Sequence, residues 1–70
     1  MTSIFRQGVA KLTVRERELI ALIRRGLQNK VIANELNISE NTVRVHIRNI
    51  MRKYKLRNRT QIAVMFTGAV

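Results

Sequence analysis

Three arginines recur at intervals of four residues in the second half of the chain. At about 100° per residue they fall along one stripe of a helix, which we call the arginine ridge (Arg44, Arg48 and Arg52). A guanidinium group is a planar fork of donors that matches the O6 and N7 acceptors of guanine in the major groove of DNA. Val45 lies beside the ridge and offers an apolar contact to a thymine methyl. The pattern therefore predicts that Arg44, Val45 and Arg48 contact DNA bases.

The helix that carries the arginine ridge is expected over about residues 40–54. Ser39 is a strong N-cap, and Glu40 complements the helix dipole in the first turn. The stripe away from the ridge is apolar and is made of Val43, Ile47, Ile50 and Tyr54, with Met51 at its edge. An ordinary solvated cationic face is the alternative interpretation, but such a face usually mixes charges of both signs.

A shorter helix is expected just before it, over about residues 29–36. Its inward side chains are Ile32, Ala33 and Leu36. Asn37 tolerates the left-handed conformation that ends many helices, and Ile38 fills the corner between the two helices. Two helices joined by a three-residue turn (residues 37–39) are the layout of a helix-turn-helix, which holds its second helix in the DNA major groove.

Two further helices are expected to complete the fold. Thr13 and Glu16 form a capping box, and Gly26 stops the helix that follows. The inner face of this helix is predicted to carry Leu19, Leu22 and Ile23, with Ile20 at its edge. The last helix is expected over residues 59–67, with Asn58 as its cap and Gln61 as the reciprocal partner. It directs Ile62, Phe66 and Ala69 to the core and Val64 outward.

The sequence therefore predicts an all-α, four-helix bundle that contains a helix-turn-helix. Residues 12–70 form this one domain, and residues 1–11 are expected to be a flexible lead-in or linker remnant. Residues 68–70 are expected to fray at the chain end. Seventy residues allow only one small core.

Charge indicates the class of partner. Fourteen Lys and Arg residues face four acidic residues, which gives a net charge of +10. The four acids, Glu16, Glu18, Glu35 and Glu40, all lie in the first 40 residues, so nothing neutralises the cations that follow. Such a one-sided field favours a polyanion, which from charge alone is DNA, RNA or an anionic membrane. The helix-turn-helix layout makes double-stranded DNA the expected partner.

Several classes are disfavoured. No apolar run approaches the roughly 20 residues that span a bilayer, so no membrane partner is expected. The absence of cysteine fits a reducing cytoplasm. The chain has no Asp, no Cys and no glycine-rich phosphate loop, so we expect neither an enzyme nor a cofactor. His46 is the single histidine; it is predicted to be a half-buried packing residue rather than a metal ligand.

Candidate phosphate contacts surround the two central helices. Lys30 opposes the dipole at the start of its helix, and a phosphate contact would offset that. Asn41 and Thr42 are short hydrogen-bonding residues in the first turn of the helix over residues 40–54. Arg52 and Lys53 are expected to neutralise phosphates farther along the same helix.

These residues also carry a family resemblance. Residues 12–19, Leu-Thr-Val-Arg-Glu-Arg-Glu-Leu, resemble the opening signature of LuxR-type (LuxR/FixJ/NarL) DNA-binding domains. The match continues through Gly26, Asn29-Lys30, Ile32-Ala33, Leu36, Ile38-Ser39, Thr42-Val43-Arg44, His46, Asn49-Ile50 and Arg59-x-Gln61, and so covers about residues 12–66. Two positions depart from the family pattern: Gln28 stands where Ser is common, which weakens the cap of the next helix, and Val31 stands where Glu is common.

The resemblance implies a transcription regulator, such as a response regulator, or its excised C-terminal domain. Its base-contacting positions fall on Arg44, Val45 and Arg48, and its phosphate-contacting positions on Lys30, Thr42 and Arg59. It also implies a homodimer through the last helix, where Val64 and Met65 are the candidate contacts, and RNA polymerase as a further partner.

Two alternatives stay open from the sequence. A sigma-factor-like module would read promoter DNA with a similar helix-turn-helix, and the opening over residues 12–19 fits it as well. A cationic helical protein would instead engage acidic membranes or an acidic protein partner, which requires a large exposed apolar face beside the charges.

Overall fold

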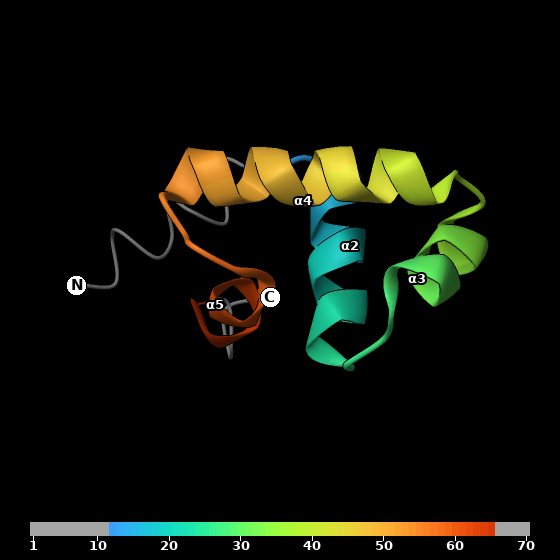
Figure 1. Ribbon diagram of the computed structural model, residues 1–70, viewed down its shortest axis with the longest axis horizontal. Helices are drawn as coiled ribbons and strands as arrows, with labels where there is room; N and C mark the ends of the chain where they lie inside the picture. The colour runs from blue at the N-terminus through green and yellow to red at the C-terminus, as the bar shows by residue number, and fades with distance from the viewer. Residues whose placement is uncertain (1–11, 66–70) are drawn as a thin grey trace.

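A computed structural model describes residues 12–65 of the chain. These residues form four α-helices and no strand: α2 (Val14–Arg24), α3 (Asn29–Leu36), α4 (Glu40–Tyr54) and α5 (Arg59–Met65). Figure 1 shows α4 along the long axis, α2 running away from its middle, and α3 and α5 on opposite sides of α2. The all-α class and the helix-turn-helix order are confirmed. The expected lead-in over residues 1–11 and the expectations for Phe66, Thr67 and residues 68–70 lie outside the described residues.

Helices α2 and α4 begin at side-chain caps that the sequence predicts. The Thr13 hydroxyl accepts from the Glu16 N–H at 3.0 Å, and the Glu16 carboxylate accepts from the Thr13 N–H at 3.1 Å, so the capping box is complete. Ser39 caps α4 by accepting from the Thr42 N–H at 3.0 Å. Each cap satisfies N–H groups that have no partner inside the helix.

The start of α5 differs in one detail from its expected cap. The Asn58 side-chain oxygen accepts from the Gln61 N–H at 3.0 Å, as predicted. The Gln61 side chain, however, accepts from the N–H of Arg57 rather than from that of Asn58. The chain bends through residues 57–58 before the helix begins, so this reciprocal bond reaches one residue farther back than in a standard capping box.

Three helices end at a residue with a left-handed backbone. These residues are Gly26 (φ 80°), Asn37 (φ 58°) and Lys55 (φ 56°). After each of them, the next N–H donates to a carbonyl five residues earlier, at 3.4, 3.0 and 2.8 Å respectively. This is the Schellman arrangement, which satisfies the last carbonyls of a helix. Gly26 and Asn37 were predicted as helix ends, whereas Lys55 was not, because lysine has no preference for positive φ.

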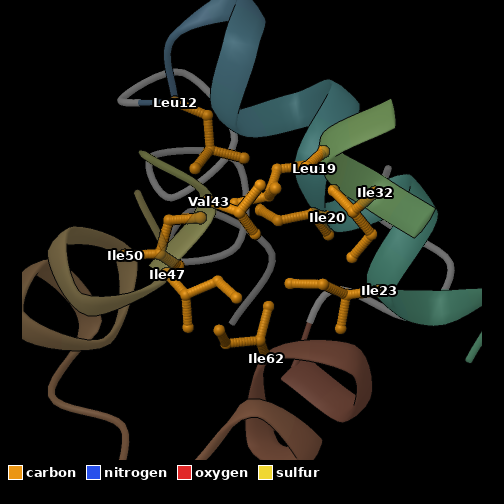
Figure 2. Close-up of a cluster of buried hydrophobic side chains, with 10 residues drawn as sticks. Leu12, Leu19, Ile20, Ile23, Ile32, Val43, Ile47, Ile50 and Ile62 are labelled. Carbon is orange, nitrogen blue, oxygen red and sulfur yellow. The ribbon is translucent and has the colours of Figure 1, made fainter. Parts of the chain in front are cut away.

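One apolar cluster joins the four helices, and Figure 2 shows their side chains converging on it. Its buried members are Leu12, Leu19, Ile20, Ile23, Ile32, Ala33, Val43, Ile47, Ile50 and Ile62. The expected arrangement on α2 was wrong in one respect: Ile20 is fully buried, while Leu22 is only half-buried. The reason is that α3, α4 and α5 all contact α2, so the buried part of the α2 surface is wider than a single stripe of side chains.

An ion pair ties the first turn of α2 to the last turn of α4. The Lys53 Nζ donates to the Glu16 Oε1 at 2.9 Å, and the Glu16 side chain is only 7% exposed. Burial alone would raise the pKa of Glu16, but the hydrogen bonds from Lys53 and from the Thr13 N–H outweigh it and leave that pKa below the ordinary 4.5. The sequence predicted Glu16 as a cap and missed its second partner.

This pair predicts a pH-dependent contribution to stability. The folded-state pKa of Glu16 lies below the unfolded value, so the carboxylate stabilises the fold above about pH 4.5. That contribution disappears as the pH falls through the folded pKa. At neutral pH we expect Glu16→Gln to lower the free energy of unfolding by about 1–3 kcal/mol, because a charged hydrogen bond is lost. Denaturation followed by circular dichroism at a series of pH values measures the difference.

The exposed Glu35 supplies the matched control, since Glu35→Gln removes the same charge from a surface position on α3. We expect only a small effect from this control at every pH. The difference between wild type and Glu16→Gln should shrink on acidification; a constant difference from neutral to acid pH would contradict the ionised pair.

Candidate nucleic-acid interface

Helix α4 presents two faces of opposite character. Val43, Ile47 and Ile50 are buried on one face, as predicted. All members of the arginine ridge are exposed on the other. Among residues 12–65, the guanidinium groups of the ridge have no hydrogen-bond or ion-pair partner. A surface of this kind can donate several charge-assisted hydrogen bonds to an external anion.

Val45 belongs to the same exposed surface. Its side chain is 40% exposed, one residue along from Arg44. The residues that the sequence predicted as base contacts therefore stand together on the outside of one helix. This helix starts directly after the turn of the helix-turn-helix, and Ile38 in that turn packs against the core as expected.

A depression of about 340 Å³ runs along one side of the arginine ridge. It lies where α4 meets the first residues of α3 and α5, and its lining residues are Asn29, Arg44, Ile47, Arg48, Met51, Asn58 and Arg59. Three arginines and two asparagines therefore surround a partly apolar floor. The depression continues the cationic surface beyond α4 itself.

The start of α3 lies beside this depression. No side chain caps α3, because Gln28 at the cap position makes no such hydrogen bond. This agrees with the departure from the family pattern at that position. Lys30 is exposed in the first turn, and no acidic side chain stands there to offset it.

Two of the other predicted phosphate contacts lie in the first turn of α4. Asn41 is exposed, whereas Thr42 is half-buried. The Thr42 hydroxyl lies 2.8 Å from the Ser39 hydroxyl, so it already takes part in the cap of α4. The Thr42 hydroxyl can donate to a phosphate when the Ser39 hydroxyl is the donor within this pair, because each hydroxyl carries only one proton.

Two predicted phosphate contacts have partners inside the molecule. Lys53 is bonded to Glu16. Arg59 donates to the Leu27 carbonyl at 2.9 Å and to the side-chain oxygen of Asn29. The guanidinium of Arg59 thereby joins the start of α5 to the segment between α2 and α3, a role that the sequence did not predict. The expectation that these two cations touch phosphates stays a prediction.

His46 and Tyr54 occupy the margins of the core. His46 is half-buried, as predicted. Tyr54 is half-buried against the apolar cluster, and its burial raises the pKa of its hydroxyl above 10.0, although the nearby charge of Lys53 opposes that shift. In the part of the chain that the structure describes, no three His, Cys, Asp or Glu side chains come together as metal ligands would.

The last helix exposes one of its two candidate dimer contacts. Val64 is 68% exposed on α5, as predicted, and Met65 is half-buried against the core. None of the helices within residues 12–65 combines the length and the apolar character needed to cross a bilayer.

Comparison with known proteins identifies the family. The model of the family described as "Bacterial regulatory proteins, luxR family" matches residues 10–66. The nitrate/nitrite response regulator protein NarL of Escherichia coli strain K12 is 48% identical over 58 residues, which is 83% of this chain and 27% of that protein. NarP of the same strain is 49% identical over 55 residues, which is 79% of this chain and 26% of that protein.

A solved structure agrees with this. The response regulator StyR superposes with a TM-score of 0.85 at 39% identity, over 96% of this chain and 34% of that one. The chain thus spans about a quarter to a third of the length of these relatives. The family is one of transcription regulators rather than enzymes. The family match therefore favours a transcription regulator over the sigma-factor-like alternative. The chain belongs to the LuxR family of bacterial regulatory proteins and has the helix-turn-helix domain of their DNA-binding transcription regulators.

Proposed function

We propose that this chain recognises specific sites in double-stranded DNA by inserting α4 into the major groove, and that it thereby regulates transcription. The observation that carries the proposal is the arginine ridge: three exposed guanidinium groups without a partner among residues 12–65, directly after a helix-turn-helix turn. A helix in this position meets base edges with its first turns. The proposal fits the family and explains why the exposed face of α4 is cationic.

In this proposal Arg44 and Arg48 donate to guanine O6 and N7, and Val45 meets a thymine methyl. Bidentate arginine–guanine contact is the commonest specific contact in the major groove. Both guanidinium groups can rotate to make such a bidentate contact, because neither has a hydrogen-bond or ion-pair partner among the described residues. Readout of G-containing steps beside a T is the expected specificity.

Lys30, Asn41, Thr42 and Arg52 are the proposed phosphate contacts. Thr42 is half-buried and the other three are exposed, and all four lie on α3 or α4. Contacts of this kind fix the register of a protein on the duplex without reading its sequence. They also release counterions, so affinity is expected to fall steeply as salt rises.

At the level of the whole protein, we propose a cytoplasmic regulator that acts as a homodimer on DNA and contacts RNA polymerase. The relatives named as response regulators support regulation of transcription, and the exposed Val64 supports association through α5. Met65 is the second proposed dimer contact, because it follows Val64 at the end of the described part of α5.

Substitution of Arg48 and Lys30 tests the division between base and phosphate contacts. A duplex selected by the wild type from a random DNA pool serves as the specific probe. Arg48→Ala is expected to weaken binding to it by about 1–3 kcal/mol, with a much smaller effect on an unselected duplex. Lys30→Ala should weaken both duplexes by a similar factor, because a phosphate contact carries no sequence information. Fluorescence anisotropy titrations measure both affinities.

An equal loss on both duplexes for Arg48→Ala would show that Arg48 does not read bases. Failure of the wild type to bind any duplex, together with tight binding to vesicles of anionic lipid, would overturn the proposed function and support the membrane alternative.

The dimer contact is tested by placing a charge on α5. Val64→Asp is expected to lower the affinity for a duplex with two half-sites by roughly tenfold or more, because linked binding is lost. Binding to a duplex with one half-site should be unaffected. Val14→Asp is the matched control, since Val14 is 74% exposed but belongs to α2 rather than to α5. Sedimentation of the protein–DNA complexes measures the stoichiometry; two bound chains for Val64→Asp at the wild-type affinity would exclude this contact.

A further inference from the structure

Lys53 differs from its neighbour Arg52 in what it contacts. Arg52 is exposed, ends the arginine ridge and has no hydrogen-bond or ion-pair partner within residues 12–65. Lys53 lies about 100° farther round α4, on the flank that carries His46, and its side chain is only 32% exposed. Its ammonium group lies 2.9 Å from the Glu16 carboxylate. Two adjacent cations on one helix thus face different surroundings.

The Glu16 carboxylate is itself held in place. It completes the capping box of α2, where its Oε1 also accepts from the Thr13 N–H at 3.1 Å. The side chain is 7% exposed, so solvent screens the pair weakly on this side. Lys53 therefore bonds to a carboxylate oxygen whose displacement would also break its hydrogen bond to the Thr13 N–H at the start of α2. Releasing Lys53 to an external phosphate would leave this buried carboxylate without its cation, which is costly.

The Lys53–Glu16 pair lies at the end of α4, where a bond has a large effect on the orientation of the helix. The buried side chains of α4 are Val43, Ile47 and Ile50, with Met51 and Tyr54 packed against the cluster, and such apolar packing has little directionality. Lys53 lies three residues beyond Ile50 and adds a directional bond in the final turn. A restraint at this end limits how far α4 tilts or rotates on α2. Bidentate contact with a base depends on such orientation, because hydrogen bonds weaken steeply when misaligned.

We propose that Lys53 is a positioning residue, which acts through Glu16 to hold α4 at the angle that base readout requires, and that it is not a phosphate contact. This inference rests on the proposed function. It assigns the pair a role in specificity rather than in non-specific affinity. It also separates Lys53 from Arg52, which remains a proposed phosphate contact.

The first test compares Lys53→Met with Arg52→Met in the full 70-residue chain. Both variants lose one positive charge from the same turn of α4. Affinities are measured over a salt series on the selected duplex and on an unselected duplex of equal length. Arg52→Met should reduce the slope of log affinity against log salt by about 0.9, the effect of one phosphate contact. Lys53→Met should leave the slope nearly unchanged, while the ratio of specific to non-specific affinity falls roughly threefold or more.

Variants of the partner complete the argument. Glu16→Gln should lower the affinity ratio as Lys53→Met does, and adding Lys53→Met to Glu16→Gln should lower it no further. Lys53→Arg keeps a cation that can reach the carboxylate and should retain the wild-type ratio. Ile62→Val removes one buried methyl group on α5, whereas the ion pair joins α2 to α4, so this variant should lower the melting temperature and leave the ratio unchanged. This control separates positioning from stability.

A drop of about 0.9 in the slope for Lys53→Met, with equal losses on both duplexes, would overturn the inference and make Lys53 a phosphate contact. So would tighter binding by Glu16→Gln, which is expected if that change frees Lys53 for DNA. If Lys53→Met fails to fold, Glu16→Gln and Lys53→Arg decide the question alone. If the wild type binds neither duplex, the proposed function fails instead, and the two failures are distinguishable.

Discussion

The rest of the structure depends on one constraint: helix α4 must pack one face into the core while its other face stays cationic and exposed. Like charges four residues apart destabilise a helix by about 0.2–0.5 kcal/mol per pair, and the arginine ridge contains two such pairs. Burying a single Val or Ile side chain contributes about 1.5–3 kcal/mol. The buried stripe of Val43, Ile47 and Ile50 therefore outweighs the repulsion within the ridge.

Five basic residues of α4 and α5 fall into two groups with different physical roles. The arginine ridge has no partner among the described residues, which leaves its hydrogen-bonding capacity for an external anion. Lys53 and Arg59 instead join elements of the fold, one through a carboxylate and the other through a carbonyl and an amide oxygen. A net charge of +10 is thus compatible with a packed domain, because cations such as Lys53 and Arg59 also make hydrogen bonds between separate elements of the fold.

The elements and their ends could be predicted from the sequence because their causes are local. A cap such as Ser39, a left-handed Asn37 and the alternation of faces on α4 depend on residues a few positions apart. The partners of Lys53 and Arg59 could not be predicted, because they lie 37 and 30 residues away and depend on how the helices pack. The same packing buries Ile20 more deeply than periodicity alone suggests. The helix end at Lys55 was missed because no side-chain preference marks it.

The interleaving of two faces along α4 has a consequence for how such domains diversify. Buried and exposed positions alternate in the chain, as in the run Val43, Arg44, Val45, where the first side chain is fully buried and the next two are exposed. Substitutions on the outer surface can therefore accumulate with little effect on the core, because surface substitutions usually change stability by at most about 0.5 kcal/mol. Homologous domains that keep the buried residues of α4 can therefore change the DNA site that they bind through single substitutions at the exposed positions. Binding preference and foldability then evolve as separable traits on the same fifteen-residue helix.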